Sequence, residues 1–216
     1  MRTKPHKFSE SNKIWFTGCT HIFHKQPFIW QKRGYESIIA HAKGVRDKIN
    51  EVVAHDDIMF HLGDSFLNST PEEVNDWLSG VKCQNIHYIS GNHESSTKKL
   101  FDNAKASLGI YDLEVYPVRH RNIIFLGPQV EIEIDGKLII LSHFPLAIWN
   151  KSQHGSWNIH SHCHGSFAES LPDFPTFKRL DVGWDVFSAP INYVHVREIM
   201  SRKQIKVLDH HDSKTT

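Results

Sequence analysis

Cysteine is scarce in this sequence, and neither sign of charge predominates. The 216 residues include three cysteines, Cys19, Cys83 and Cys163, an odd number with wide spacing. A disulfide framework is therefore not expected, and free thiols in a reducing compartment fit better. There are 25 Lys and Arg residues against 24 Asp and Glu residues, which gives a formal charge of +1. No overall field would draw the protein to nucleic acid or to an anionic membrane, although a local basic patch could.

Long apolar runs are also missing. The longest, such as residues 137–144, are far shorter than the roughly 20 residues that a membrane-spanning helix needs, so no membrane partner is expected. Residues 1–13 are polar and lack the apolar segment of a signal peptide, which favours a cytoplasmic location. The 39% hydrophobic and 23% charged fractions are those of an ordinary globular protein. We expect one domain over residues 1–216, with loose polar ends at 1–11 and 210–216.

Short β-rich runs alternate with longer amphipathic runs, which predicts an α/β domain. The strands expected in the first half are 14–17, 58–62 and 85–90, and the helices are 35–54 and one that begins at Thr70-Pro71. The later elements expected are a helix at about 96–107, strands at 113–118, 123–126, 130–134, 138–142, 157–160, 179–182 and 205–208, and a helix at about 192–201. Asp135-Gly136 is typical of a tight hairpin turn, so the second half should be more antiparallel.

Histidine is the residue in excess, with 17 copies, and many of them lie in short motifs. Five segments combine metal-ligating and proton-transferring residues: Cys19-Thr20-His21, Gly63-Asp64, Gly91-Asn92-His93-Glu94, Ser142-His143-Phe144-Pro145 and His162-Cys163-His164-Gly165. Four of the five directly follow a predicted strand, and loops beyond the carboxyl ends of strands in an open α/β sheet converge on one crevice. Asp, Asn and His together suit two divalent ions of intermediate hardness, such as manganese, iron, zinc or nickel, better than calcium.

The order of these segments resembles the calcineurin-like metallophosphoesterase family, whose pattern is D-x-H, G-D, G-N-H-D/E, H and G-H-x-H. The resemblance runs from about residue 14 to residue 165, and "LDVGWD" at 180–185 looks like a trailing segment of small phage and bacterial members. Each motif alone is weak, whereas five in the right order are a strong signal. The resemblance implies a four-layer sandwich of two mixed β-sheets flanked by α-helices, and a phosphoesterase activity that depends on two divalent metal ions.

The resemblance also implies a set of metal ligands. Those of the first metal are His21, Asp64, His164 and the residue at Cys19, where the family has an aspartate. Those of the second metal are Asp64 as the bridging ligand, Asn92, His143 and His162. Two such cations polarise a phosphoryl group and lower the pKa of a water molecule, so no Ser, Thr or Cys nucleophile is required.

Three further residues receive catalytic roles. His93 resembles the family's catalytic histidine, which contacts the phosphate and protonates the leaving oxygen, and Glu94 would orient it. An imidazole with a near-neutral pKa suits that proton transfer. His24, three residues after His21, could also approach the phosphate.

Cys19 is the main departure from the family pattern, and three alternatives are open. It could bind as a thiolate, since zinc and iron accept mixed sulfur, nitrogen and oxygen ligands. It could instead leave the first metal to the other ligands with water filling the gap, or the protein could be an inactive member. Every other motif position is intact, which argues against the last alternative. A thiolate would favour ions softer than magnesium and make activity sensitive to oxidation.

The patterns together predict a di-metal phosphoesterase whose substrate is a phosphodiester, small or nucleotide-like. The preference for diesters comes from the resemblance and from the small size of the chain. One alternative is a nuclease of phage or bacterial nucleic-acid metabolism, with an oligonucleotide partner and a basic track beside the crevice. The other is a catalytically weak or inactive metal-binding regulatory protein. Trp149, Trp157 and Trp184 could stack on a nucleobase, but packing in the core or rim is the expectation.

Overall fold

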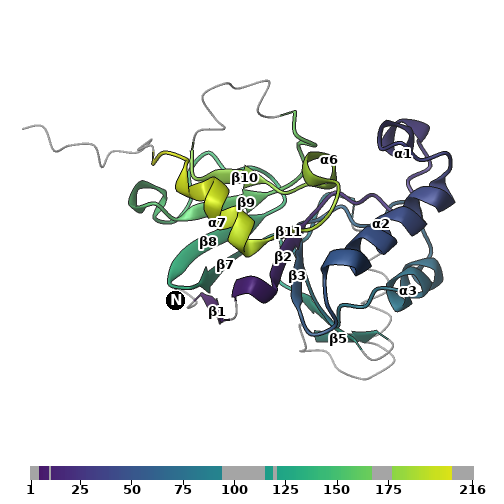
Figure 1. The fold of residues 1–216 in the computed structure, drawn as a ribbon, viewed down its shortest axis with the longest axis horizontal. Coiled ribbons are helices and arrows are strands. Elements are labelled where there is room, and N and C mark those ends of the chain that lie inside the picture. The colour runs from purple at the N-terminus through teal and green to yellow at the C-terminus, as the bar shows by residue number, and fades with distance from the viewer. Residues whose placement is uncertain (1–4, 10, 94–114, 119–120, 167–176, 206–216) are drawn as a thin grey trace, which may run out of the picture.

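Two β-sheets form the framework of the molecule (Figure 1). The computed structural model describes residues 5–9, 11–93, 115–118, 121–166 and 177–205. The six-stranded sheet, in the order β11-β2-β3-β4-β6-β5, contains β2 (Ile14–Thr17), β3 (Ile58–His61), β4 (Asn85–Tyr88), β5 (Val115–Val118), β6 (Arg121–Phe125) and β11 (Ile191–Asn192). The five-stranded sheet, in the order β1-β7-β8-β9-β10, contains β1 (His6–Phe8), β7 (Gln129–Ile134), β8 (Lys137–Ser142), β9 (Trp157–His160) and β10 (Arg179–Asp181).

Both sheets are mixed. Strands β2, β3, β4 and β6 run parallel, and the antiparallel strands β11 and β5 form the two edges. In the other sheet β7 and β8 form an antiparallel hairpin, whereas β8, β9 and β10 run parallel. Asp135 and Gly136 turn the hairpin with φ values of 50° and 73°, as the Asp-Gly pair predicts. The parallel strands bring the loops after β2, β3 and β4 to one edge and those after β8 and β9 to another.

A shared hydrophobic core joins the sheets. Phe16 on β2 stacks on Phe60 of β3 with ring centroids 5.5 Å apart, and this cluster continues into Ile139, Leu141 and Ile159 of the five-stranded sheet. Helix α7 (Tyr193–Ser201) adds buried side chains to the same cluster, namely Tyr193, Val196 and Met200. Burying apolar surface on both partners fixes the two sheets face to face.

Helices α2 (Ile38–Val52) and α3 (Pro71–Ser79) cover the outer face of the six-stranded sheet, on the side away from the five-stranded sheet (Figure 1). The start of α3 follows its sequence signals, because Thr70 and Glu73 form a reciprocal capping box and Pro71 occupies the first turn. Its inward face carries the expected residues Val74, Trp77 and Leu78. The expected α/β fold of two mixed sheets flanked by helices is therefore confirmed.

Several elements differ from expectation. Residues 6–8 are not loose but form edge strand β1, which pairs parallel with β7 through the main chain and inserts Phe8 against Phe60. The short helices α1 (Pro27–Lys32) and α6 (Trp184–Phe187) are too brief to show helical periodicity and escaped prediction. A strand was expected to begin at Ile205, but this residue lies outside any strand. The predictions at 96–107, 113–114, 206–208 and 210–216 lie outside the described residues. No helix in the described part of the chain is long and apolar enough to cross a bilayer.

Candidate metal centre

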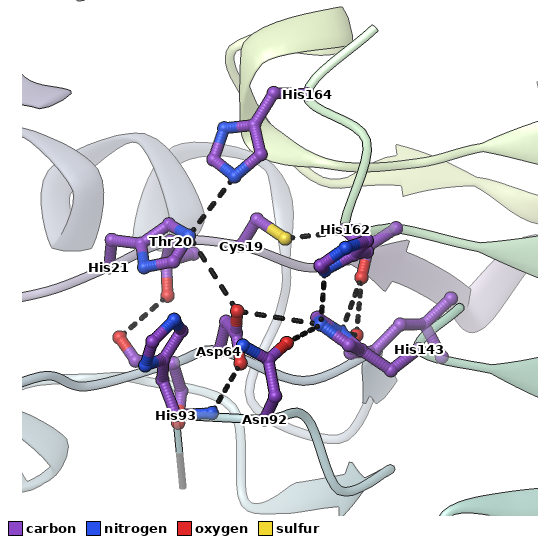
Figure 2. Close-up of polar contacts among 12 residues, drawn as sticks. Cys19, Thr20, His21, Asp64, Asn92, His93, His143, His162 and His164 are labelled. Atoms are coloured by element: carbon purple, nitrogen blue, oxygen red, sulfur yellow. Dashed lines mark hydrogen bonds and ion pairs between the residues drawn. The ribbon is translucent and has the colours of Figure 1, made fainter. Parts of the chain in front are cut away.

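The loops after β2, β3, β4, β8 and β9 bring the predicted ligands together (Figure 2). Their labelled side chains, Cys19, His21, Asp64, Asn92, His143, His162 and His164, point toward a common centre. His93 lies beside them, whereas Glu94 falls outside the described residues. The strand order thus brings all the proposed ligands to one place, although Cys19 and His164 are 145 residues apart in the sequence.

Unusual backbone conformations concentrate at this centre. Left-handed φ values of 50° to 68° occur at five of the proposed ligands: Cys19, His21, Asp64, His162 and His164. Each such residue costs on the order of 1 kcal/mol or more, and persists only where its surroundings fix it. Main-chain hydrogen bonds provide that fixation, since the amides of Cys19 and His21 donate to the carbonyls of Gly63 at 2.9 Å and Asp64 at 3.0 Å. Strain at functional sites is common, and here it aims ligating side chains inward.

Two motif glycines allow the loops to approach one another closely. A Cβ atom on Gly63, whose φ is +86°, would come within 2.4 Å of Nδ1 of His143. A Cβ atom on Gly91 would come within 2.3 Å of Oδ1 of Asp64. Gly63 is thus required because a side chain would clash and because its φ is positive, whereas Gly91 is required because a side chain would clash.

On one side of the centre, three possible ligand atoms lie around Nε2 of His143. Its Nδ1 lies 2.8 Å from the carbonyl oxygen of Leu62, which accepts hydrogen bonds only, so Nδ1 carries the proton and Nε2 the lone pair. This Nε2 atom lies 2.9 Å from Oδ1 of Asn92, 3.1 Å from Nδ1 of His162 and 3.4 Å from Oδ2 of Asp64. One proton would satisfy a single contact of the three, whereas a metal cation accepts lone pairs from all the atoms at once. This half fits a cation.

On the other side, two imidazoles face each other. Nε2 of His21 lies 3.2 Å from Nε2 of His164 and 3.9 Å from Oδ2 of Asp64. Nδ1 of His164 contacts Oδ2 of Asp185 at 2.5 Å, which places the His164 proton on Nδ1 and its lone pair toward His21. Burial lowers the pKa of His21 to about 3, so this ring is neutral at ordinary pH. The second half therefore also offers nitrogen lone pairs to a cation.

Cys19 lies between the two halves. Its sulfur atom is buried and accepts a hydrogen bond from the main-chain amide of His162 at 3.1 Å. Candidate ligand atoms lie within 4.8 Å of one another in two groups, Cys19 with His21 and His164, and Cys19 with Asp64 and His143. Burial raises the pKa of the thiol, and coordination to a metal is what would deprotonate it. The position of the sulfur suits a ligand.

Asp64 is held in its ionised form. Burial alone would raise its pKa, but the neighbouring His143 and the main-chain amide of His93, which donates to Oδ1 at 2.9 Å, lower the pKa of Asp64 to about 2. A carboxylate between several imidazoles supplies the negative charge that a cation needs.

The two predicted catalytic histidines lie beside the His21 half. The ring centroid of His93 is 6.2 Å from that of His21, and the centroid of His24 is 5.7 Å from it. His93 is exposed, whereas burial and the neighbouring His93 lower the pKa of His24. Both imidazoles are thus placed where a substrate at the centre could meet them.

Three residues near the centre were missed by sequence reasoning. Asp185 contacts His164, and Arg33 forms a forked ion pair with Asp185. Asp185 ends the "LDVGWD" segment, so its place in that segment was an available signal, whereas Arg33 belongs to no motif. Phe144 is 50% exposed and its ring centroid lies 4.4 Å from that of His162. By contrast, the three tryptophans considered for base stacking are buried, namely Trp149, Trp157 and Trp184.

The two-sheet α/β fold and a centre rich in imidazole, carboxylate and thiol are the features expected of a metal-dependent hydrolase. The chain belongs to the calcineurin-like phosphoesterase family, whose model matches residues 12–184. Membership implies metal-dependent hydrolysis of a phosphoester substrate. A similar fold occurs in the crystal structure of AQ665, a protein of unknown function from Aquifex aeolicus, with a TM-score of 0.58 and 17% sequence identity. The similarity covers 86% of this chain and 98% of that one. No curated protein matches the sequence.

Proposed function

We propose that this protein is a di-metal phosphodiesterase acting on a small or nucleotide-type substrate. The observation that carries the proposal is the convergence of lone pairs in both halves of the centre, around His143 Nε2 and between His21 and His164. Asp64 lies within 4 Å of both halves and is the proposed bridging ligand. The remaining proposed ligands are Cys19, Asn92 and His162. Manganese, iron, zinc and nickel suit this donor set.

Cations held by these residues would polarise the phosphoryl group and activate water for attack. The chain's own residues then position the substrate and move protons. His93, exposed beside His21, is proposed to donate a proton to the leaving oxygen, and Glu94 to orient His93. His24, which lies close to His21 and His93, is proposed to contact the phosphate.

Of the three alternatives for Cys19, we propose thiolate ligation. Its sulfur belongs to both groups of candidate ligand atoms, which supports a role in the centre itself rather than a gap filled by water. A buried thiol among apolar neighbours would be an inert hydrophobe, yet this one is surrounded by four side chains that can ligate a metal: His21, Asp64, His143 and His164.

Phe144 supports a nucleotide-type substrate. Phe144 is half exposed and lies at the edge of the centre, where its ring contacts the ring of His162. Exposed aromatic rings beside a phosphate site offer a stacking surface for a nucleobase, worth about 1–3 kcal/mol per base. We expect Phe144→Ala to raise KM for nucleotide diesters more than for alkyl phosphodiesters, which have no aromatic ring to stack.

The deciding experiment is a substrate and metal screen. Metal-free protein is reloaded with manganese, iron, zinc or nickel and assayed on bis(p-nitrophenyl) phosphate, cyclic nucleotides, dinucleotides and short oligonucleotides. Turnover of the smaller diesters supports the proposal. Cleavage of oligonucleotides alone, with steep loss of rate as salt rises, would instead identify a nuclease. Metal binding without turnover of any substrate would identify a regulatory protein.

A further inference from the structure

Arg33 lies in the segment after α1 and is the hub of a hydrogen-bonded network next to the candidate metal centre. Its side chain is only 5% exposed. Nε donates to Oδ1 of Asp185 at 2.8 Å and Nη2 donates to Oδ2 at 2.7 Å, which is a bidentate pair. The same guanidinium donates to two main-chain carbonyls, from Nη2 to Cys19 at 2.8 Å and from Nη1 to Thr20 at 2.7 Å.

Each end of this network holds a loop that carries proposed ligands. The carbonyls of Cys19 and Thr20 belong to the loop in which Cys19 and His21 both adopt left-handed backbone conformations. At the other end, Asp185 accepts the Nδ1 proton of His164, another left-handed residue. One guanidinium therefore connects the loop after β2 to the loop after β9, although Arg33 and Asp185 are 152 residues apart.

The chemistry of arginine is matched to this task. Five N–H groups in a planar fork can serve a carboxylate and two carbonyls at once, and here the fifth direction, from Nη1, faces Nε2 of His41 at 3.0 Å. A lysine has three N–H groups on a single nitrogen and cannot reproduce the planar fork that spans the carboxylate and both carbonyls. Burial of the fork between loops also excludes the water that would weaken its bonds.

We propose that Arg33 and Asp185 are positioning residues that lock the Cys19–His21 loop onto His164 and so organise the first-metal half of the centre. The proposal rests on the proposed metal site but adds two residues that are not among its ligands. Asp185 keeps the Nε2 lone pair of His164 turned toward His21. Arg33 fixes the position of Asp185 relative to the main chain of Cys19 and Thr20. The second half takes Asn92 and His143 from the loops after β4 and β8, whereas the hydrogen bonds of Arg33 and Asp185 given above go to the loops after β2 and β9, so the second half should be affected much less.

The test compares Arg33→Met, Arg33→Lys and Asp185→Asn with wild type. The matched controls are Lys43→Met and Asp47→Asn, which break an exposed ion pair on α2. Metal binding is measured by titration of metal-free protein with Mn²⁺ and with Zn²⁺. Losing a partner that orients a ligand typically weakens metal affinity about 10–100-fold, so we expect that loss for one of two bound ions and a much smaller change for the other. Arg33→Lys should recover little of the loss, and the controls should match wild type.

Hydrogen exchange on the metal-free proteins provides a second readout. Amides of residues 18–22 and 161–165 should exchange faster in Arg33→Met and Asp185→Asn than in wild type and controls, while those of β4 should not. Unchanged affinity for both ions would overturn the positioning role, even if exchange were faster, and equal loss of both ions would do the same. A wild type that binds no metal would overturn the proposed function, and the exchange comparison would still decide whether Arg33 joins the two loops.

Discussion

The sulfur atom of Cys19 accepts a hydrogen bond from the main-chain amide of His162, 143 residues further along the chain, at 3.1 Å. The thiol is therefore aimed at the loop that carries His162 and His164, rather than into the core. This orientation places sulfur at the centre of a site that the family builds with an aspartate at the same position. It makes Cys19 the first residue to test.

Cys19→Asp should change which metal the centre prefers. Replacing a thiolate by a carboxylate favours harder ions, so we expect tighter binding of Mn²⁺ and weaker binding of Zn²⁺, with hydrolysis retained. Metal content after reloading and the rate on bis(p-nitrophenyl) phosphate are the measurements. Thiolate ligation would be wrong if the first site were empty in wild type and filled only in Cys19→Asp.

Oxidation provides an independent test of the same sulfur. Thiolates oxidise more readily than thiols, so peroxide should inactivate wild type, and Cys19→Asp should keep its activity for at least about ten times as long. The measurement is the rate on bis(p-nitrophenyl) phosphate after timed exposure to peroxide.

Cys163→Ser is the control for this oxidation test. Cys163 is a partly exposed thiol in the loop after β9, and its sulfur belongs to neither group of candidate ligand atoms among the described residues. The Cys163→Ser protein should therefore keep the peroxide sensitivity of wild type. Equal sensitivity of wild type and Cys19→Asp would contradict the prediction.

Asp64→Asn should abolish most of the activity. The substitution keeps the shape of the side chain but removes the charge that lies within 4 Å of both His21 and His143. We expect kcat/KM to fall at least about 100-fold, with loss of bound metal measured on the same sample. Asp47→Asn, on the exposed face of α2, is the control for loss of one carboxylate. Full activity of Asp64→Asn would exclude the bridging role.

His93→Ala should slow the reaction according to the leaving group. General acid catalysis contributes about 10²–10⁴-fold, and it matters most when the leaving oxygen is basic. We therefore expect a large loss of kcat on nucleoside and alkyl diesters and a much smaller loss on p-nitrophenyl esters, whose leaving group needs no proton. His55→Ala, an exposed histidine in the turn before β3, should leave both rates unchanged. A uniform loss on all esters would remove the proton-donor role.

His87 should contribute to the loss of stability in acid. The ring lies in β4 against Phe8 and Phe60, and burial lowers the pKa of His87 to about 4. The unfolded chain takes up the proton near pH 6.5 and the folded chain only near pH 4, so stability is lost as the pH falls through that window. The contribution is about 3 kcal/mol at most.

The measurement is urea unfolding of metal-free protein between pH 7 and pH 4. His87→Leu should flatten the fall in the free energy of unfolding relative to wild type, because leucine cannot take up a proton. All other buried histidines are present in both proteins, so the difference isolates His87. Parallel curves for the two proteins would show that His87 does not contribute.

Local signals in the sequence were sufficient for much of the framework. Strands 14–17 and 157–160 have the predicted bounds, because short apolar runs end at Gly or Ser and at the motif residues that follow. The Asp135-Gly136 turn and the Thr70 cap also follow from the residues that form them. Each of these features depends on side chains a few positions apart, which is why sequence patterns reveal them.

The site was partly predictable for a related reason. Its proposed ligands follow strands closely, and parallel strands place such residues at one edge of a sheet, so the strand pattern alone predicts that they converge. Edge strand β1 is different, because it pairs with β7 through its main chain and its side chains carry no clear pattern. Its three residues were expected to be loose for that reason.

The sequence by itself determined the fold class, the family and the residues that gather at the centre. Tertiary structure decided how they meet: that the sulfur of Cys19 lies among ligand atoms of both halves, and that Arg33 joins Asp185 to the loop of Cys19. The physical reason is distance along the chain. Motifs record residues that are neighbours in sequence, whereas hydrogen bonds across 14 to 152 residues form only when the sheets and loops are packed together.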